Sequence, residues 1–297
     1  MSLETWIIST RPWSLVMTFI SACIAGILAY GEGSFNIPIF LLTMLGLMIA
    51  HISANMTNDY YDVIHGVDEK APTSLYRPHP LLKGEIDRKK YMKAIFLLYS
   101  LGISISLFLT WLYGYPVLIY SILGVLLGIF YTADPVMLKH RSIGEISVFL
   151  AFGPLMVGGT YYVLTQKISI EPMIVSIPIG LLVALVLLAN NLRDREFDAS
   201  VGISTITTNR SLAEGVSYYK LLLVSAYLSI PILIYLGLLS FFSFVVFVTI
   251  HEAINIVKSF SIKIPLNSDQ VTSQLALHFG LLLVIGEFIN IIFNSLK

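Results

Sequence analysis

Two short polar segments hold an unusual share of the acidic residues of this 297-residue chain. Asn58 and Asp62 are four residues apart in the first segment. Asp194 and Asp198 have the same spacing in the second. Residues at i and i+4 share one face of a helix, where negative charges repel one another unless a cation lies between them. Because Mg²⁺ prefers oxygen ligands and binds through one or two carboxylates plus substrate phosphates, the two segments predict Mg²⁺ ions held against one diphosphate.

Basic and amide side chains lie close to both segments in the sequence. Arg77 and Lys83 follow the first segment, and Lys139 follows a later apolar run. Arginine suits bidentate phosphate binding, and lysine acts as a point charge. We expect these three residues to contact the diphosphate, and the same role is assigned to Asn190 and Asn191 of the second segment. The alternative for the basic residues is that they only orient the chain in a membrane.

The composition indicates which class of protein carries these polar segments. Hydrophobic residues make up 56% of the chain and charged residues only 12%, whereas an ordinary soluble domain has about 25% charged residues. This excludes a soluble globular enzyme, a nucleic-acid binder and a disordered protein. Cys23 is the single cysteine, which excludes a disulfide framework and a multi-cysteine metal site.

Nine apolar runs have lengths near the roughly 20 residues that a spanning helix needs. They cover residues 13–30, 37–56, 91–111, 115–132, 143–164, 173–189, 218–236, 240–257 and 274–295. Short connections join them and leave no room for a soluble domain. The sequence therefore predicts an all-α polytopic membrane protein with nine transmembrane helices, which forms a single domain over residues 1–297.

Lys and Arg residues predict the orientation of these spans. All of them except Lys167 and Lys297 fall in the N-terminal segment or near the loops after the second, fourth, sixth and eighth runs. By the positive-inside rule, we expect a cell-membrane protein whose N-terminus and acidic segments lie in the cytoplasm and whose C-terminus lies outside.

Three other interpretations of the acidic segments are open. They could be ordinary solvated loop charges, the ion path of a cation-coupled transporter, or part of a non-catalytic scaffold. Intramembrane ion paths place their carboxylates at membrane depth, whereas these lie at the cytoplasmic ends of apolar runs. The repeated helical spacing, with an amide beside the carboxylates both times, favours a metal site.

The two acidic segments resemble those of the UbiA superfamily of intramembrane prenyltransferases, which follow the second and sixth of nine helices. The resemblance covers nearly the whole chain. Within the superfamily, the 1,4-dihydroxy-2-naphthoate polyprenyltransferases of menaquinone synthesis are most similar. That similarity lies at residues 11–15, 58–68, 152–162 and 191–205.

The resemblance implies that Asn58, Asp62, Asp194 and Asp198 hold an Mg²⁺–diphosphate inside a UbiA-like helical bundle. Asp68 matches the last acid of the first motif. The sequence departs from the pattern at two places. Gly66 stands where many members have a third Asp, and residues 203–204 are Ile and Ser where a basic residue is expected.

The implied reaction is electrophilic aromatic alkylation of an acceptor by a polyprenyl diphosphate. Mg²⁺ and the basic residues neutralise the leaving diphosphate, and the face of Tyr131 could steady the allylic cation. Asp68 or Asp59 could accept the phenolic proton of the acceptor. The expected acceptor is dihydroxynaphthoate, with 4-hydroxybenzoate, homogentisate and geranylgeranylglyceryl phosphate as alternatives. The expected partners are the two substrates and the lipid bilayer, with no nucleic acid and no obligate protein partner.

Overall fold

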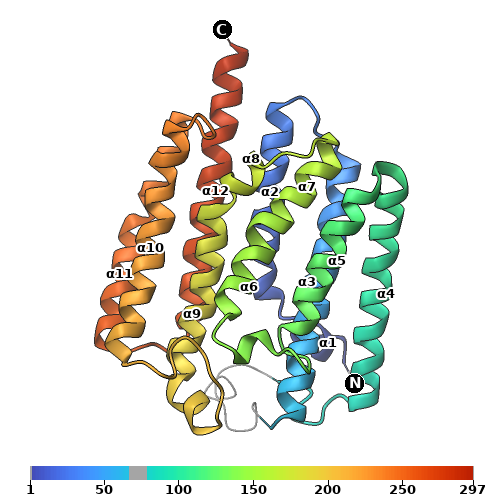
Figure 1. Cartoon of the computed structure of the whole chain (residues 1–297), viewed down its shortest axis with the longest axis vertical. Helices are drawn as coiled ribbons and strands as arrows, with labels where there is room; N and C mark the ends of the chain where they lie inside the picture. The colour runs from blue at the N-terminus through green and yellow to red at the C-terminus, as the bar shows by residue number, and fades with distance from the viewer. Residues whose placement is uncertain (1, 67–78, 297) are drawn as a thin grey trace.

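Apolar helices make up most of the part of the chain that the computed structural model describes, residues 2–66 and 79–296. Within these residues only an isolated bridge, Arg141 to Ser204, has β-type pairing. The α-helices are α1 (Leu3–Ser9), α2 (Leu15–Gly31), α3 (Ile37–Ile64), α4 (Arg88–Tyr113), α5 (Tyr115–Phe130), α6 (Gly144–Leu150), α7 (Met156–Thr165), α8 (Glu171–Val175), α9 (Ile177–Ser200), α10 (Leu212–Tyr235), α11 (Ile250–Ile262) and α12 (Ser268–Ser295). The long helices run side by side along the long axis of the molecule (Figure 1).

Eight helices of the described residues are long and apolar enough to cross a membrane, and α5 is a shorter apolar helix. Together they occupy the places of the predicted runs, which confirms the all-α, multi-pass architecture. The fourth run is shorter than predicted, because α5 ends at Phe130. Its 16 residues extend only about 24 Å, less than the roughly 30 Å of a bilayer core.

Several spans are not continuous α-helices. The span Gly144–Thr165 contains a π-helical segment, Ala151–Leu155, which includes Pro154. Proline has no backbone N–H and disrupts the regular hydrogen-bond ladder, so this irregularity has a local cause. Another span begins as the 3₁₀ segment η5 (Phe241–Thr249) and continues as α11. The predicted sixth run is also divided, because α8 ends at Val175 and α9 begins at Ile177.

Helices α3 and α9 extend well beyond their apolar runs. The apolar run of α3 was predicted to end at residue 56, but the helix continues to Ile64. In the same way, α9 continues past residue 189 to Ser200. Both acidic segments are therefore helical, as their spacing predicts. The lower ends of α3 and α9 lie at the end of the bundle that holds the N-terminus, and the C-terminus lies at the opposite end (Figure 1).

Close packing at the C-terminal helix keeps the second half of the bundle together. Gly286 of α12 faces the backbone of η5, where a Cβ atom would lie 2.7 Å from the carbonyl oxygen of Phe242. Beside it, Glu287 accepts hydrogen bonds from the backbone N–H of Ser240, at 2.8 Å, and from the Ser243 hydroxyl. Glycine at position 286 thus lets a helix and a 3₁₀ segment approach at backbone distance.

We therefore expect Gly286→Ala to destabilise the protein by about 1–3 kcal/mol, since the added methyl meets backbone that cannot rotate away. The measurement is the melting temperature of the purified protein in detergent. Gly124→Ala is the matched control, because a Cβ there meets nothing within 4 Å. Equal melting temperatures for both variants would contradict the close approach of α12 and η5.

Candidate active site

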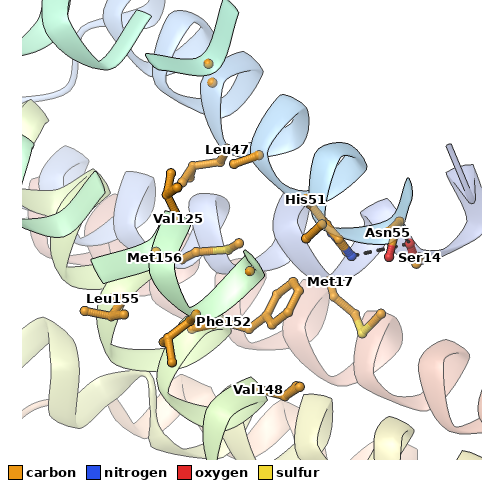
Figure 2. Close-up of a pocket in the computed structure, with 18 of the residues that line it drawn as sticks. Ser14, Met17, Leu47, His51, Asn55, Val125, Val148, Phe152, Leu155 and Met156 are labelled. Atoms are coloured by element: carbon orange, nitrogen blue, oxygen red, sulfur yellow. Dashed lines mark hydrogen bonds between the residues drawn. The ribbon is translucent and has the colours of Figure 1, made fainter. Parts of the chain in front are cut away.

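A cavity of about 960 Å³ lies between the helices. One end is polar and includes Arg11, Asn58, Lys139 and Asn190. Most of the remaining wall is apolar and comes from α2, α3, α4, α5, α7, α9 and α12. Figure 2 shows part of this wall. The cavity can therefore accept a molecule with a charged head and a long hydrocarbon tail.

Asn58 of the first acidic segment lines the polar end, whereas Asp62 is not among the described residues that line the cavity. Asn58 and Asp62 are buried on α3, 7% and 2% exposed. The ammonium of Lys139 lies 2.7 Å from Oδ2 of Asp62 and 3.4 Å from Oδ1 of Asn58. Lys139 belongs to the short 3₁₀ turn Leu138–His140, which follows α5. The structure thus brings together three of the predicted site residues from two separate parts of the chain.

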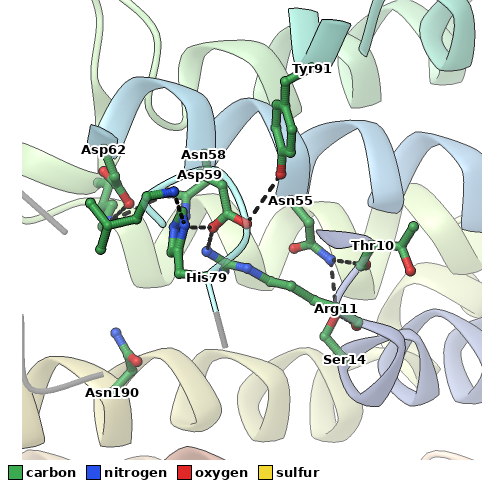
Figure 3. Close-up of polar contacts among 12 residues, drawn as sticks. Thr10, Arg11, Ser14, Asn55, Asn58, Asp59, Asp62, His79, Tyr91 and Asn190 are labelled. Atoms are coloured by element: carbon green, nitrogen blue, oxygen red, sulfur yellow. Dashed lines mark hydrogen bonds and ion pairs between the residues drawn. The ribbon is translucent and has the colours of Figure 1, made fainter. Parts of the chain in front are cut away.

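The second acidic segment faces the first. Asp194 and Asp198 are buried on α9, and Asp198 lies within electrostatic range of Asp62 and Lys139. Arg193 donates to both carboxylate oxygens of Asp194, at 2.9 and 2.7 Å. In Figure 3, Asn190 of α9 lies across from the α3 residues. The pairing of the two motifs at one site is therefore a feature of the fold.

Arg193 connects this site to the start of α12. Besides Asp194, its guanidinium donates to Oδ1 of Asp269 at 2.9 Å, to the carbonyl of Leu266 at 3.2 Å, and to Oδ1 of Asn190. Its side chain is only 2% exposed. This arginine was not among the site residues predicted from the sequence. Its position next to Asp194 in the sequence was the signal that could have identified it.

The donor set fits a magnesium ion that is completed by its substrate. No three His, Cys, Asp or Glu side chains converge on a metal position within the described residues. Mg²⁺ needs only one or two carboxylates where substrate phosphates and water supply the other ligands. Asp62, Asp194 and Asp198 provide such oxygens on two facing helices. The ammonium of Lys139 occupies a position between Asp62 and Asn58 where a cation is favourable.

Tyr131 adds a neutral hydrogen-bond donor to the site. It caps the end of α5 and lines the cavity. Burial raises the pKa of Tyr131, and the negative charges of Glu145 and Asp62 raise it further. The phenol therefore keeps its proton above the usual pKa of tyrosine, about 10. It can donate a hydrogen bond to an anion over the whole physiological pH range.

Asp59 has a different environment from its neighbours in the sequence. It forms an ion pair with Arg11, and the Tyr91 hydroxyl lies 3.4 Å from its Oδ2. The ring of His79 is also near, with Nε2 at 3.5 Å from Oδ1 (Figure 3). Like Asp62, Asp194 and Asp198, Asp59 is not among the described residues that line the cavity, but it alone of the four pairs with Arg11. This geometry favours a structural ion pair for Asp59, and its role as proton acceptor stays a prediction.

The remaining predicted residues lie in varied places. Asn190 lines the cavity, but buried Asn191 points to Glu145 and donates to its Oε1 at 2.8 Å. Lys83 is exposed and does not line the cavity. Asp68 and Arg77 lie outside the described residues.

A basic residue stands beside the segment where the sequence lacks one. Arg141 pairs with Ser204 through the isolated bridge, and the backbone N–H of Ser142 donates to the Ser204 carbonyl at 3.1 Å. The guanidinium of Arg141 is held by the carbonyl of Pro135 at 3.0 Å. The backbone of the connection after α5 thus lies beside Ser204, while the exposed guanidinium of Arg141 is directed to Pro135.

Comparison with known proteins identifies relatives over nearly the whole chain. The sequence profile of the UbiA prenyltransferase family matches residues 19–261. The 1,4-dihydroxy-2-naphthoate octaprenyltransferase of Bacillus subtilis (strain 168) is 25% identical over 285 residues, which cover 95% of this chain and 91% of that protein.

Solved structures share the fold at low sequence identity. The apo structure of a UbiA homolog from Aeropyrum pernix K1 has a TM-score of 0.71 and 14% identity, with 91% of this chain and 97% of that chain covered. A UbiA homolog from Archaeoglobus fulgidus bound to GPP and Mg²⁺ has a TM-score of 0.58 and 15% identity, with 92% and 99% covered.

Asp59 pairs with a cation, whereas Asp198 lies near two other carboxylates, so we expect the two Asn substitutions to change stability in opposite directions. Asp59→Asn should destabilise the protein by about 1–3 kcal/mol, because partly buried Arg11 loses an anionic partner. Asp198→Asn should raise the melting temperature in EDTA, because it removes one of three clustered carboxylates. Thermal unfolding in detergent measures both. A stabilising Asp59→Asn would show that its ion pair with Arg11 is not structural.

Proposed function

The chain belongs to the UbiA prenyltransferase family and is a prenyltransferase, and from this premise we propose that it transfers a polyprenyl group to 1,4-dihydroxy-2-naphthoate. The observation that carries the proposal is a cavity whose polar end is lined by Asn58 of α3, Asn190 of α9 and Lys139, with an apolar wall beyond it. Such a cavity matches a donor with a diphosphate head and an isoprenoid tail. The naphthoate acceptor is supported by the name of the Bacillus subtilis relative.

The donor head would bind between α3 and α9. Asn58, Asp62, Asp194 and Asp198 would hold the Mg²⁺, which when bound neutralises charge on the diphosphate as a Lewis acid. Lys139 then turns from Asp62 toward the phosphate oxygens, a movement that the long lysine side chain allows.

Bond breaking starts at the allylic carbon of the donor. The C–O bond breaks, and its electron pair leaves with the diphosphate. Lys139 and Tyr131 donate hydrogen bonds to the oxygen on which charge develops, and such preorganised donors stabilise the transition state. The apolar wall of the cavity keeps water from the allylic cation.

Bond formation follows at an electron-rich ring carbon of the acceptor. That carbon attacks the allylic cation and forms the new C–C bond. It then loses its own substituent, either a proton that moves to the deprotonated ring oxygen or a carboxylate that leaves as CO₂, and the ring becomes aromatic again. Asp68 is our proposed acceptor for the phenolic proton, with Asp59 as the second choice.

The location of the reaction follows from the distribution of charge. The N-terminus and both acidic segments lie at one end of the bundle, and the C-terminus lies at the other (Figure 1). Nearly all Lys and Arg residues belong to the first end in the predicted topology. By the positive-inside rule, we propose that the site opens toward the cytoplasm.

A transfer assay in liposomes tests this proposal. It supplies geranylgeranyl diphosphate, Mg²⁺ and separate acceptors: dihydroxynaphthoate, 4-hydroxybenzoate, homogentisate and a prenylated glycerol phosphate. We expect prenylated dihydroxynaphthoate as the product. Asp194→Ala should lower turnover by at least about 100-fold, because it removes an oxygen ligand at the site of charge development. EDTA should abolish the reaction.

The outcomes of the assay separate the alternatives. Product from another acceptor alone would reject the naphthoate assignment but keep the mechanism. Wild-type turnover by Asp194→Ala would contradict the proposed metal site. An absence of product with every acceptor, from protein that melts cooperatively, would favour a transporter or a scaffold.

A further inference from the structure

We propose that Ser14, His51 and Asn55 form the subsite that recognises a hydroxyl group of the aromatic acceptor, with Oδ1 of Asn55 as the atom that accepts its hydrogen bond. This inference rests on the proposed function, because it assigns a second substrate to the same cavity. All three residues line the cavity, and Figure 2 shows them together at one side of it.

Asn55 lies on α3 within one helical turn of Asn58, where an acceptor would be adjacent to a diphosphate held at Asn58. Asn55 precedes Asn58 by three residues, so it lies about 4.5 Å further along the helix axis. His51 lies one turn beyond Asn55. A carbon that attacks the allylic carbon must come within about 3–3.5 Å of it. An acceptor held at Asn55 is therefore next to a diphosphate held at Asn58.

The hydrogen bonds of Asn55 fix the orientation of its amide. Nδ2 lies 3.3 Å from the carbonyl oxygen of Thr10 and 2.9 Å from Oγ of Ser14 (Figure 3). A carbonyl can only accept, so the atom that faces Thr10 must be the amide nitrogen. Both of its hydrogens are then used. In the described part of the chain, no donor reaches the other amide atom, Oδ1.

His51 and Ser14 complete a network in which the remaining groups are satisfied. Oγ of Ser14 donates to the carbonyl of Arg11 at 2.8 Å, so it can only accept from Asn55 and from Nε2 of His51, which is 3.4 Å away. Nδ1 of His51 then accepts from the Thr18 hydroxyl at 2.8 Å. Oδ1 of Asn55 is the acceptor of this network that no donor of the described residues reaches, and it lies on the cavity wall where a ligand hydroxyl can donate to it.

The surrounding wall suits a flat ring. Phe152 packs edge-to-face on the imidazole of His51, with ring centroids 4.9 Å apart. Met17 and Val148 lie near them in Figure 2. An isoprenoid tail at this position would leave Oδ1 without a donor, at a cost of about 1–3 kcal/mol. A hydroxylated aromatic ring satisfies the amide and contacts the apolar side chains, so it is the ligand that fits.

The subsite positions the acceptor and does not take its proton. An amide oxygen is not a general base, so the hydroxyl keeps its hydrogen while it is bound to Asn55. Its oxygen can still donate electron density into the ring, which makes the adjacent ring carbon the nucleophile. Asn55 therefore acts as a specificity-determining residue.

The test compares two acceptors in the liposome assay: dihydroxynaphthoate and the analogue in which one hydroxyl is a methyl ether. In Asn55→Ala we expect the KM for dihydroxynaphthoate to rise about tenfold, with an unchanged KM for the donor, since one hydrogen bond to a neutral partner is lost. The variant should no longer discriminate between dihydroxynaphthoate and the methyl ether of the recognised hydroxyl. Ser53→Ala, whose hydroxyl only donates to the Ile49 carbonyl of its own helix, should behave as wild type.

A second pair of variants covers the case in which Asn55→Ala misfolds. His51→Leu should raise the acceptor KM, whereas His51→Gln should restore it, because an amide can donate to Ser14 and accept from Thr18. A rise in donor KM instead of acceptor KM, or equal discrimination by wild type and Asn55→Ala, would overturn the subsite. An absence of transfer by the wild-type protein would instead contradict the proposed function.

Discussion

A cluster of carboxylates buried at the end of an apolar cavity is the constraint on which the rest of the structure depends. Asp62, Asp194 and Asp198 are each less than one-tenth exposed. Buried charges are costly unless cations and hydrogen-bond donors surround them. Lys139 pairs with the first of them and Arg193 with the second. The first pair connects α3 to the segment after α5, and a further pair of Arg193 with Asp269 connects α9 to α12.

In the proposed function, the same pairs would prepare the site for the donor. A diphosphate with its metal ion has both signs of charge, so it could exchange partners with the cluster at little electrostatic cost. Lys139 already stands at the polar end of the cavity, and Tyr131 lines the same cavity with its proton retained. Donors that are positioned before the reaction need no reorganisation during it, which is the main source of electrostatic catalysis. The unfavourable free energy of bringing these charges together is compensated during folding.

The sequence was sufficient to predict the helices and the acidic motifs, because both depend on local periodicity. Asn58 and Asp62 share a helix face whatever the rest of the chain does. The ion pair of Arg11 with Asp59 joins residues 48 positions apart, and no local pattern predicts it. Arg193 was not predicted as a site residue for the same reason, since its contact with α12 exists only in the folded bundle. The π-helical segment and the broken start of α9 likewise arise where proline interrupts an apolar pattern.

One face of α3 explains why a single cavity can hold two unlike substrates. Its side chains change along the helix from a carboxylate at Asp62 to amides at Asn58 and Asn55, then to the imidazole of His51 and the apolar Leu47. In the proposed function, a diphosphate with its metal ion would bind beside Asp62 and Asn58, and an isoprenoid chain would lie beside Leu47. The hydroxylated ring has intermediate polarity, so its best position lies between them, next to the carbon that it attacks. The order of residues on this helix thus determines the order of the substrates.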